Sequence, residues 1–218
     1  MNSIEAKPLS QLDYLHFRQN FLPFLQLLFF QPITTNTVTQ LKEAGNIAEL
    51  AVMNLGGKYL QQFFAEVTEV QLQEQEAEFN RLFVGPGPIL APPWESVYSS
   101  REHLLFDEAT FQVRELYHRF GKQFINENNE PDDHLVIELD FLHFLNNKGL
   151  QEGDVTLVDC QLAFLEEHLS RWVPRFCELI LKHSDSLLYR GAALLLRDFV
   201  DEDLQSLREI KEALVDVR

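Results

Sequence analysis

Two segments carry most of the side chains in this chain that could act on another molecule. The first, residues 79–98, reads FNRLFVGPGPILAPPWESVY, and the second, residues 130–134, reads EPDDH. Neither contains a nucleophile with a base, a phosphate-binding loop or a cage of metal ligands. Together they predict a shaped surface with acids beside it, which favours binding of an extended partner over catalysis.

The first segment is stiffened by proline. Proline fixes φ and lacks an N–H group, so residues 85–88 (GPGP) cannot offer consecutive N–H groups to a phosphate. We expect a preformed wall there, to which Pro92, Pro93 and Trp94 add a rigid aromatic edge. Such a surface holds a peptide at low entropic cost. The alternative, that Trp94 only pins a long loop to the core, stays open at this point.

The second segment combines a proline, two aspartates and a histidine. Pro131 suits the first turn of a helix, and Asp132 and Asp133 favour the positive end of its dipole. Helix capping therefore explains much of the cluster, but it gives no role to His134. We expect Asp133 and His134 to exchange hydrogen bonds with the backbone or an arginine of a guest.

A di-metal enzyme is the catalytic alternative. Glu115 and His118 form one Glu-x-x-His motif, and Asp140 and His143 an imperfect second, with Glu138 nearby. A carboxylate-bridged site needs two complete motifs and two further glutamates. The chain also lacks the nucleophile and nucleotide signatures of common enzymes. We therefore expect a non-enzymatic protein without a metal or cofactor.

The elements that position these residues are predicted to be helices. Apolar residues recur at helical spacing almost throughout, and no run alternates with period two, which predicts an all-α, multi-helix bundle. Pro23 should kink or split the first helix, Gly56-Gly57 should separate two helices, and Asp154 should cap another. The apolar pattern predicts two final helices, at residues 188–199 and 204–214.

The chain is expected to have two helical parts. The N-terminal part, residues 1–125, carries the proline-rich groove loop, and the C-terminal part comprises residues 134–218. The polar residues 126–133 between them are predicted to be a hinge. Such a hinge would permit exchange of helical halves between two copies.

Net charge restricts the partners. The chain has 34 acidic residues against 18 Lys and Arg, a net charge of -16. Such a surface repels phosphate backbones and anionic lipid, so we expect no nucleic acid and no membrane partner. A cationic partner is favoured, although acidity alone also keeps a protein soluble. The apolar run at residues 21–30 is too short to span a bilayer, and Cys160 and Cys177 are expected to be free thiols. These features favour a cytoplasmic protein.

The two segments resemble the paired signatures of a known family. Residues 79–86 followed by 92–98 resemble the first signature of the TorD/DmsD family, and residues 130–134 the second, at a matching spacing. These are cytoplasmic chaperones for molybdenum-dependent redox enzymes exported by the twin-arginine route. The resemblance covers residues 78–199 and is strongest to DmsD-like members, many of which have tryptophan at the position of Phe79.

The resemblance implies a function as well as an all-helical fold. The two signatures would converge on a groove for the N-terminal leader of a dimethyl sulfoxide reductase-type precursor, which carries two arginines before an apolar stretch. The chaperone would assist cofactor loading and proofread the precursor before it reaches the export machinery. By resemblance, the leader-binding residues are Phe79, Leu82, Phe83, Pro93, Trp94, Asp133 and His134, supported by Glu130, Pro131 and Tyr98.

The energetics of such binding rest on apolar contact. Burial of three leader side chains gains about 5–9 kcal/mol, and ordering the peptide costs about 2–5 kcal/mol, which leaves roughly micromolar affinity. Exposed Arg–carboxylate pairs add about 0–1 kcal/mol each, so charge should act mainly on the association rate. One alternative keeps the fold but matures another metal-dependent redox or hydrolytic client without reading a leader. The other is the di-metal enzyme.

Overall fold

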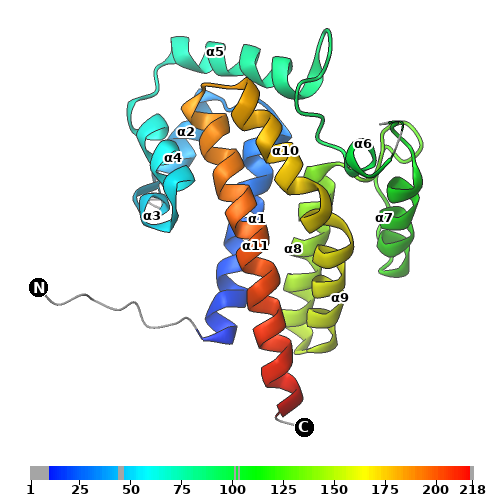
Figure 1. The fold of residues 1–218 in the computed structure, drawn as a ribbon. Helices are drawn as coiled ribbons and strands as arrows, with labels where there is room; N and C mark the ends of the chain where they lie inside the picture. Colours follow the sequence, from blue (N-terminus) through cyan, green and yellow to red (C-terminus); the bar gives the residue numbers. More distant parts are fainter. Residues whose placement is uncertain (1–9, 44–46, 101, 103, 217–218) are drawn as a thin grey trace, which may run out of the picture.

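The computed structural model describes residues 10–43, 47–100, 102 and 104–216, and most of these lie in helices (Figure 1). Within those ranges the β-structure amounts to isolated bridges, so the all-α prediction is confirmed. The helices, with η denoting π-helices, are α1 (Gln11–Phe30), α2 (Thr35–Glu43), α3 (Ile47–Met53), α4 (Leu55–Glu66), α5 (Glu69–Phe79), η1 (Asn80–Val84), α6 (Glu95–Ser99), α7 (Glu108–Arg119), α8 (Leu135–Glu152), α9 (Thr156–Phe164), η2 (Leu165–Leu169), α10 (Ser170–His183) and α11 (Leu187–Asp216).

The long helices form one bundle. Helix α1 packs on α8, α11 packs on α4 and α10, and α9 lies against α8, while α5 crosses one end (Figure 1). Trp172 and Phe176 of α10 and Leu22 and Leu28 of α1 are fully buried in a shared core. Because α1 and α4 pack on α8 and α11, the parts before and after residues 126–133 share this core. Whether residues 126–133 act as a hinge stays a prediction.

A buried ion pair joins three of these helices. The Arg18 guanidinium has no exposed surface, and its Nε lies 2.6 Å from Oδ1 of Asp203 on α11. Arg18 also donates to Asn146 of α8 (2.9 Å), and the Tyr14 hydroxyl donates to Asp203 (2.8 Å). A buried charge is tolerated when it is paired and hydrogen-bonded, as here. The network fixes α1 against α8 and α11.

Three sequence predictions about helix boundaries need correction. The two predicted final helices are one 30-residue helix, α11, since no glycine or proline interrupts it between its two apolar runs. Pro23 does not split α1, which is continuous over 20 residues, and the alternative that Pro23 kinks the helix stays a prediction. The helix break lies at Asn54 and not at the glycines, because the Asn54 side chain caps α4 by accepting from the Gly57 N–H at 2.9 Å.

Gly56 and Gly57 have a packing role instead. A Cβ at Gly56 would come within 2.6 Å of the Gly191 carbonyl oxygen, and one at Gly57 within 1.7 Å of the Leu50 carbonyl oxygen. The two glycines therefore let α4 approach α11 and α3 closely.

Asp154, predicted to cap a helix, lies one residue before the N-cap of α9, which is Val155. The Asp154 carboxylate still accepts from the Thr156 N–H at 2.9 Å, at the first residue of that helix. Cys160 and Cys177 are both free thiols. Among the described helices, none is both long and apolar enough to cross a bilayer.

The glycine contacts give a test of this packing. Gly57→Ala should destabilise the protein by about 1–3 kcal/mol in urea unfolding, because the new methyl group meets backbone that cannot move aside. Gly149→Ala in α8 is the matched control. Its added Cβ would lie 3.6 Å from its nearest neighbours, so a gain of up to about 1 kcal/mol is expected. Equal effects of the two substitutions would contradict the close approach of α3 and α4.

Candidate functional site

The two signature segments meet in the fold. Trp94 and His134 form an isolated antiparallel bridge, in which the Leu135 N–H donates to the Pro93 carbonyl at 2.9 Å. The indole and imidazole rings lie edge to face, with centroids 5.4 Å apart and planes at 80°. The start of α8 therefore lies against the residues that lead into α6. The sequence prediction that the two segments converge is confirmed.

Asp133 holds this junction together from inside. Its side chain is fully buried, Oδ2 accepts from the Ser96 N–H at 2.6 Å, and Oδ1 accepts from the Thr110 hydroxyl at 2.6 Å. Its carbonyl accepts from the Glu95 N–H at 3.0 Å. Since both carboxylate oxygens already have internal donors, the geometry gives Asp133 a positioning role for α6 and α7 relative to α8.

His134 is the N-cap of α8. Its Nδ1 accepts from the Val136 N–H at 3.1 Å, so the expectation that His134 has no capping role was wrong. Pro131, expected in the first turn, precedes the helix, which begins at Leu135. Burial lowers the pKa of His134 to about 4, against a smaller opposite effect of Asp133. The ring is therefore neutral at neutral pH, and with Nδ1 accepting, Nε2 carries the proton that can be donated to a guest.

Asp132 anchors the preceding polar segment. Its Oδ2 accepts from Nε of Arg114 on α7, and its carbonyl accepts from the Tyr117 hydroxyl at 3.3 Å. Arg114 also donates to Asn128 at 3.1 Å. Glu130 is exposed, and its N–H donates to the Asn126 carbonyl at 3.1 Å. Side chains of α7 thus hold the segment predicted to be a hinge.

The first signature is supported by the core. Phe79, Leu82 and Phe83 are buried, and the Phe83 ring packs against the Phe176 and Tyr189 rings. The N–H of residue 91 donates to the carbonyl of residue 82 at 2.9 Å, which folds the proline loop back onto η1. Of the seven predicted leader-binding residues, Trp94 and His134 are partly exposed. The other five are buried, namely Phe79, Leu82, Phe83, Pro93 and Asp133.

Tyr98 links the proline loop to the core, and its supporting role at a binding groove stays a prediction. Its hydroxyl donates to the Pro92 carbonyl at 2.7 Å, and its ring stacks on that of Trp172 with centroids 5.4 Å apart. The proline loop is thereby tied to α10.

An apolar cavity lies beside the start of α8. It has a volume of about 290 Å³ and was not anticipated from the sequence. Val136 and Ile137 of α8 form one side, and Gln26 of α1 donates to the Val136 carbonyl at 3.1 Å. Two lining residues, Phe30 and Ile125, are large, apolar and exposed, at 64% and 93%. The cavity arises from helices far apart in sequence, so no local pattern signals it.

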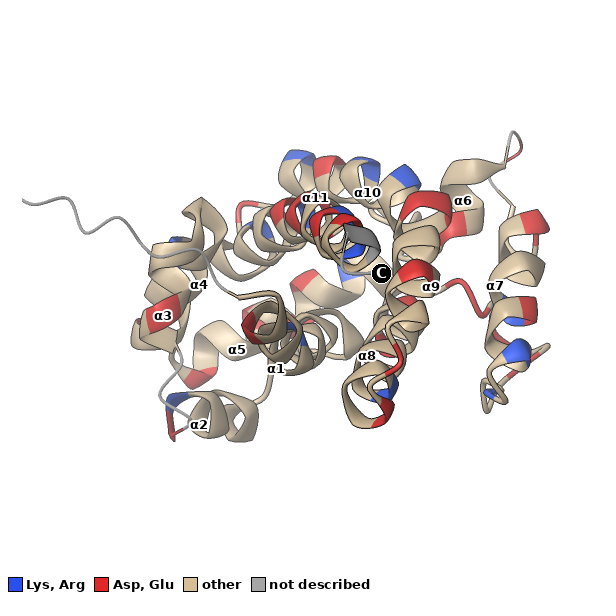
Figure 2. Ribbon diagram, turned by 90° about the horizontal axis from the view of Figure 1, so that it is seen from below, with Lys and Arg blue, Asp and Glu red and all other residues tan. Residues whose placement is uncertain are grey.

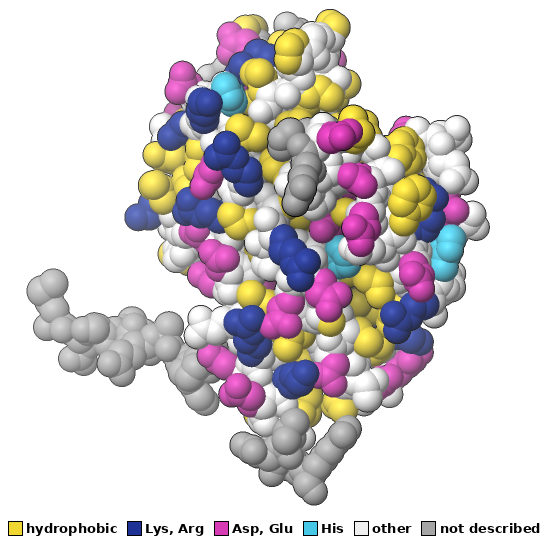
Figure 3. Space-filling view, turned by 45° about the vertical axis from the view of Figure 1, so that its right-hand side comes forward, with side chains coloured by type: hydrophobic (Ala, Val, Ile, Leu, Met, Phe, Trp, Pro, Cys, Tyr) yellow, Lys and Arg dark blue, Asp and Glu magenta, His cyan; other side chains and the backbone are white. Residues whose placement is uncertain are grey.

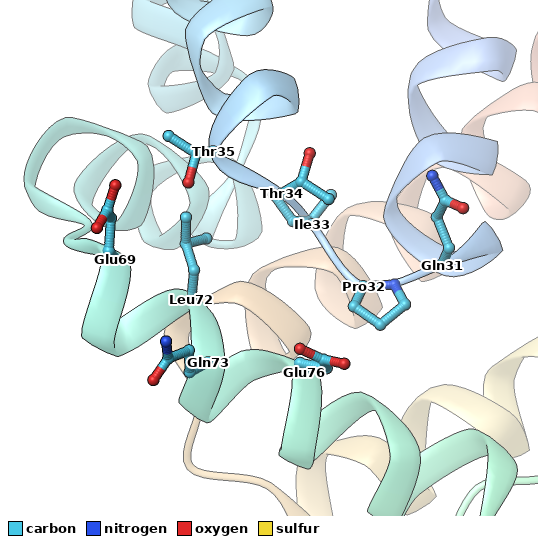
Figure 4. Close-up of a pocket in the computed structure, with 9 residues that line it drawn as sticks. All are labelled: Gln31, Pro32, Ile33, Thr34, Thr35, Glu69, Leu72, Gln73 and Glu76. Carbon is cyan, nitrogen blue, oxygen red and sulfur yellow. The ribbon is translucent and has the colours of Figure 1, made fainter.

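A second cavity, of about 440 Å³, lies on the other side of the α1 C-terminus. It separates residues 31–35 from α5, and Figure 4 shows Leu72 pointing toward this loop with Glu69 and Glu76 on either side. Because Phe30 lines the first cavity and Gln31 the second, the two flank the end of α1.

Charge on the surface is predominantly acidic. Figure 2 shows Asp and Glu on most helices, including α7, α9 and α11. On the face in Figure 3, acidic, basic and hydrophobic side chains are interspersed.

The residues of the di-metal alternative do not assemble. Within the described part of the chain, no three His, Cys, Asp or Glu side chains are placed to hold an ion. His118 instead pairs with Glu127 at 2.9 Å, and His143 with Asn147 at 2.8 Å. Glu138 is buried and accepts from the indole of Trp172.

Comparison with known proteins identifies the family. Residues 51–178 match the family model described as nitrate reductase delta subunit. The Tat proofreading chaperone DmsD of Salmonella typhi is 33% identical over 55% of this chain and 55% of its own length, so this chain spans about half of that relative. The chaperone protein TorD of Vibrio cholerae serotype O1 is 29% identical over 86% of this chain and 90% of its own.

A solved structure shares the fold. The crystal structure of a protein from Archaeoglobus fulgidus that is assigned to redox enzyme maturation superposes with a TM-score of 0.52 at 20% identity, over 92% of this chain and 99% of its own. At that identity the likeness shows the fold alone. The chain belongs to the nitrate reductase delta subunit family, with the TorD and DmsD chaperones, as the resemblance implied. These relatives are named as chaperones, in agreement with the expectation of a non-enzymatic protein.

The capping role of His134 predicts how stability depends on pH. The folded pKa of about 4 lies below the unfolded value of about 6.5, so this contribution is complete above the unfolded value and is lost as pH falls toward 4. His134→Asn keeps a capping acceptor but cannot titrate. Between neutral pH and pH of about 4, the wild type should lose roughly 3 kcal/mol more than the variant in urea unfolding. The control His143→Asn, which leaves His134 in place, should follow the wild type, and parallel curves for wild type and His134→Asn would contradict the assignment.

Proposed function

We propose that the protein is a cytoplasmic chaperone that binds the twin-arginine leader of a dimethyl sulfoxide reductase-type molybdoenzyme precursor. It would hold the precursor during cofactor loading and proofread it before export. The observation that carries the proposal is the contact between Trp94 and His134, which brings the two family signatures into one surface.

The surface has the chemistry that a peptide backbone needs. Trp94 and His134 are partly exposed, and the neutral imidazole has Nε2–H to donate. The carbonyls and N–H groups behind them are already paired through the bridge and through Asp133. The two rings are therefore held in place before a guest arrives, which lowers the entropic cost of binding.

The neighbouring apolar cavity suits the apolar part of the leader. It begins at Val136, two residues after His134, and Phe30 and Ile125 lie exposed around it. Burial of about three leader side chains there would gain roughly 5–9 kcal/mol, against about 2–5 kcal/mol for ordering the peptide. This balance supports roughly micromolar affinity.

The arginines of the leader would select the acidic side of the surface. Glu69 and Glu76 line the cavity on the other side of the α1 C-terminus (Figure 4). Both are exposed, so each pair with an arginine contributes only about 0–1 kcal/mol. The net charge of -16 therefore acts chiefly on the rate of encounter and on the choice of a cationic guest.

Removal of the indole tests the surface directly. Trp94→Ala should bind a synthetic leader peptide at least about tenfold more weakly by calorimetry, because truncation of a central aromatic contact typically costs about 2 kcal/mol or more. The circular dichroism spectrum should remain helical, since Trp94 precedes α6 and belongs to no long helix. Equal affinity in the two proteins would exclude this surface.

A substitution at the cavity rim tests the apolar contact. Ile125→Glu should weaken peptide binding about tenfold, because a carboxylate would meet the apolar part of the leader. Stability should change by less than about 0.5 kcal/mol, since Ile125 is 93% exposed. Val52→Glu on α3, at a position 85% exposed and outside the cavity, is the matched control and should bind like wild type. Wild-type affinity in Ile125→Glu would place the apolar contact elsewhere.

A further inference from the structure

Behind the Trp94–His134 contact lies a buried polar network that no sequence pattern singled out. Glu95 follows Trp94 and is 3% exposed, and Glu138 lies in the first turn of α8 and is fully buried. Oε2 of Glu95 lies 2.9 Å from Nδ1 of His168 in η2. Glu95 belongs to α6 and Glu138 to α8, so the network lies inside the same junction that Trp94 and His134 form at the surface.

The two glutamates face one another. The Glu138 side chain is within hydrogen-bonding reach of that of Glu95, and its Oε2 accepts from the Trp172 indole at 3.1 Å. Oε1 of Glu138 receives no N–H or hydroxyl donor among the described residues. Two ionised carboxylates offer acceptors only, so a hydrogen bond between them requires a proton on one.

The surroundings decide which carboxyl keeps the proton. Glu138 is fully buried, while Glu95 already has His168 as its partner. Burial raises the pKa of Glu138 well above its usual range, and the charges of Glu95 and Asp133 raise it further. The Tyr117 hydroxyl of α7 also faces this cluster, with its own pKa raised by burial first and then by these acids. Among the described residues, those with the largest effects on Glu138 are Glu95, Asp133 and Trp172, and none of these is a cation.

We propose that Glu138 is a protonated positioning residue that donates its proton to Glu95 and thereby holds α6, and with it Trp94, against the start of α8. Loss of that proton to solvent leaves two buried carboxylates side by side without a donor between them. Their repulsion in a medium of low dielectric separates α6 from α8 and opens the Trp94–His134 contact. The surface is thus competent only while the proton is shared.

The direction of the pH effect follows from the raised pKa. The folded state keeps the proton above the pH at which the unfolded chain releases it, so the stabilising contribution is complete below the unfolded value and declines as pH rises to the folded pKa. Above the folded pKa the competent fraction falls tenfold per pH unit. The apparent affinity for a guest falls with it, about tenfold per pH unit.

The test is calorimetry with a twin-arginine leader peptide, repeated from neutral into alkaline pH. This readout rests on the proposed function, so it tests both proposals together. Wild-type affinity should fall about tenfold per pH unit beyond the folded pKa. Glu138→Gln keeps an acceptor for Trp172 and an amide donor for Glu95, so its affinity should match the neutral wild type within about twofold and stay constant with pH. Glu138→Ala, which removes the bond, should bind at least about tenfold more weakly at neutral pH.

Glu152→Gln, an exposed change of the same type on α8, is the control and should follow the wild type. A wild type whose binding does not change with alkaline pH would overturn the proposal. A Glu138→Gln variant that retains the wild-type pH dependence would do the same.

A second readout needs no peptide and separates failure of this inference from failure of the proposed function. The infrared spectrum of the wild type at neutral pH should contain the carbonyl band of a buried carboxylic acid, which disappears in alkali and is missing in Glu138→Gln. With that band present, a peptide that fails to bind would exclude the proposed function and leave the shared proton established. A wild-type spectrum without the band would overturn the shared proton, whatever the peptide does.

Discussion

The buried carboxylate of Asp133 is the constraint on which the arrangement of this surface depends. It accepts from the N–H of Ser96 and the hydroxyl of Thr110, so one side chain fixes the starts of α6 and α7 relative to α8. A buried carboxylate without donors would be strongly destabilising, so separation of α6 or α7 from α8 would cost the hydrogen bonds that Asp133 accepts. Trp94 and His134 meet at the surface because the residues beside them meet at Asp133. The buried part of the second signature, Asp133, therefore has a structural role, while the proposed binding role falls to His134 at the surface.

The rest of the molecule supplies a rigid support for that junction. The first signature contributes its aromatic side chains to the core, where Phe83 packs between the rings of α1 and α10, and the ion pair of Arg18 and Asp203 fixes α1 beside α8. With the surface ordered in advance, binding of an unfolded segment, as proposed above, would cost conformational freedom only in the guest. The paired glutamates behind Trp94 add a polar contact whose strength depends on a single proton.

Sequence reasoning predicted the all-helical fold and the convergence of the two signatures, because helical periodicity is a local property and the signatures were recognised as a pair. It could not predict what depends on where a helix starts or on its neighbours. His134 became a cap because α8 begins at Leu135 and not at Pro131. Gly56 and Gly57 lie inside α4 because Asn54 caps that helix before them, and their lack of a side chain lets α3 and α11 approach closely. The apolar cavity between α1, α7 and α8 and the pairing of Glu95 with Glu138 join residues distant in sequence, which no pattern in a single chain reports.

Hydrogen–deuterium exchange with and without a bound leader peptide would test the central claim most directly, because it maps the guest without altering the chaperone. The account predicts slower exchange, in the presence of peptide, in segments 92–98 and 133–138, which contain Trp94 and His134, and in residues 122–126 beside the apolar cavity. Amides of α9 and of the C-terminal half of α11, which lie away from this surface, should be unchanged. Protection confined to those distant helices while the peptide is bound would contradict it.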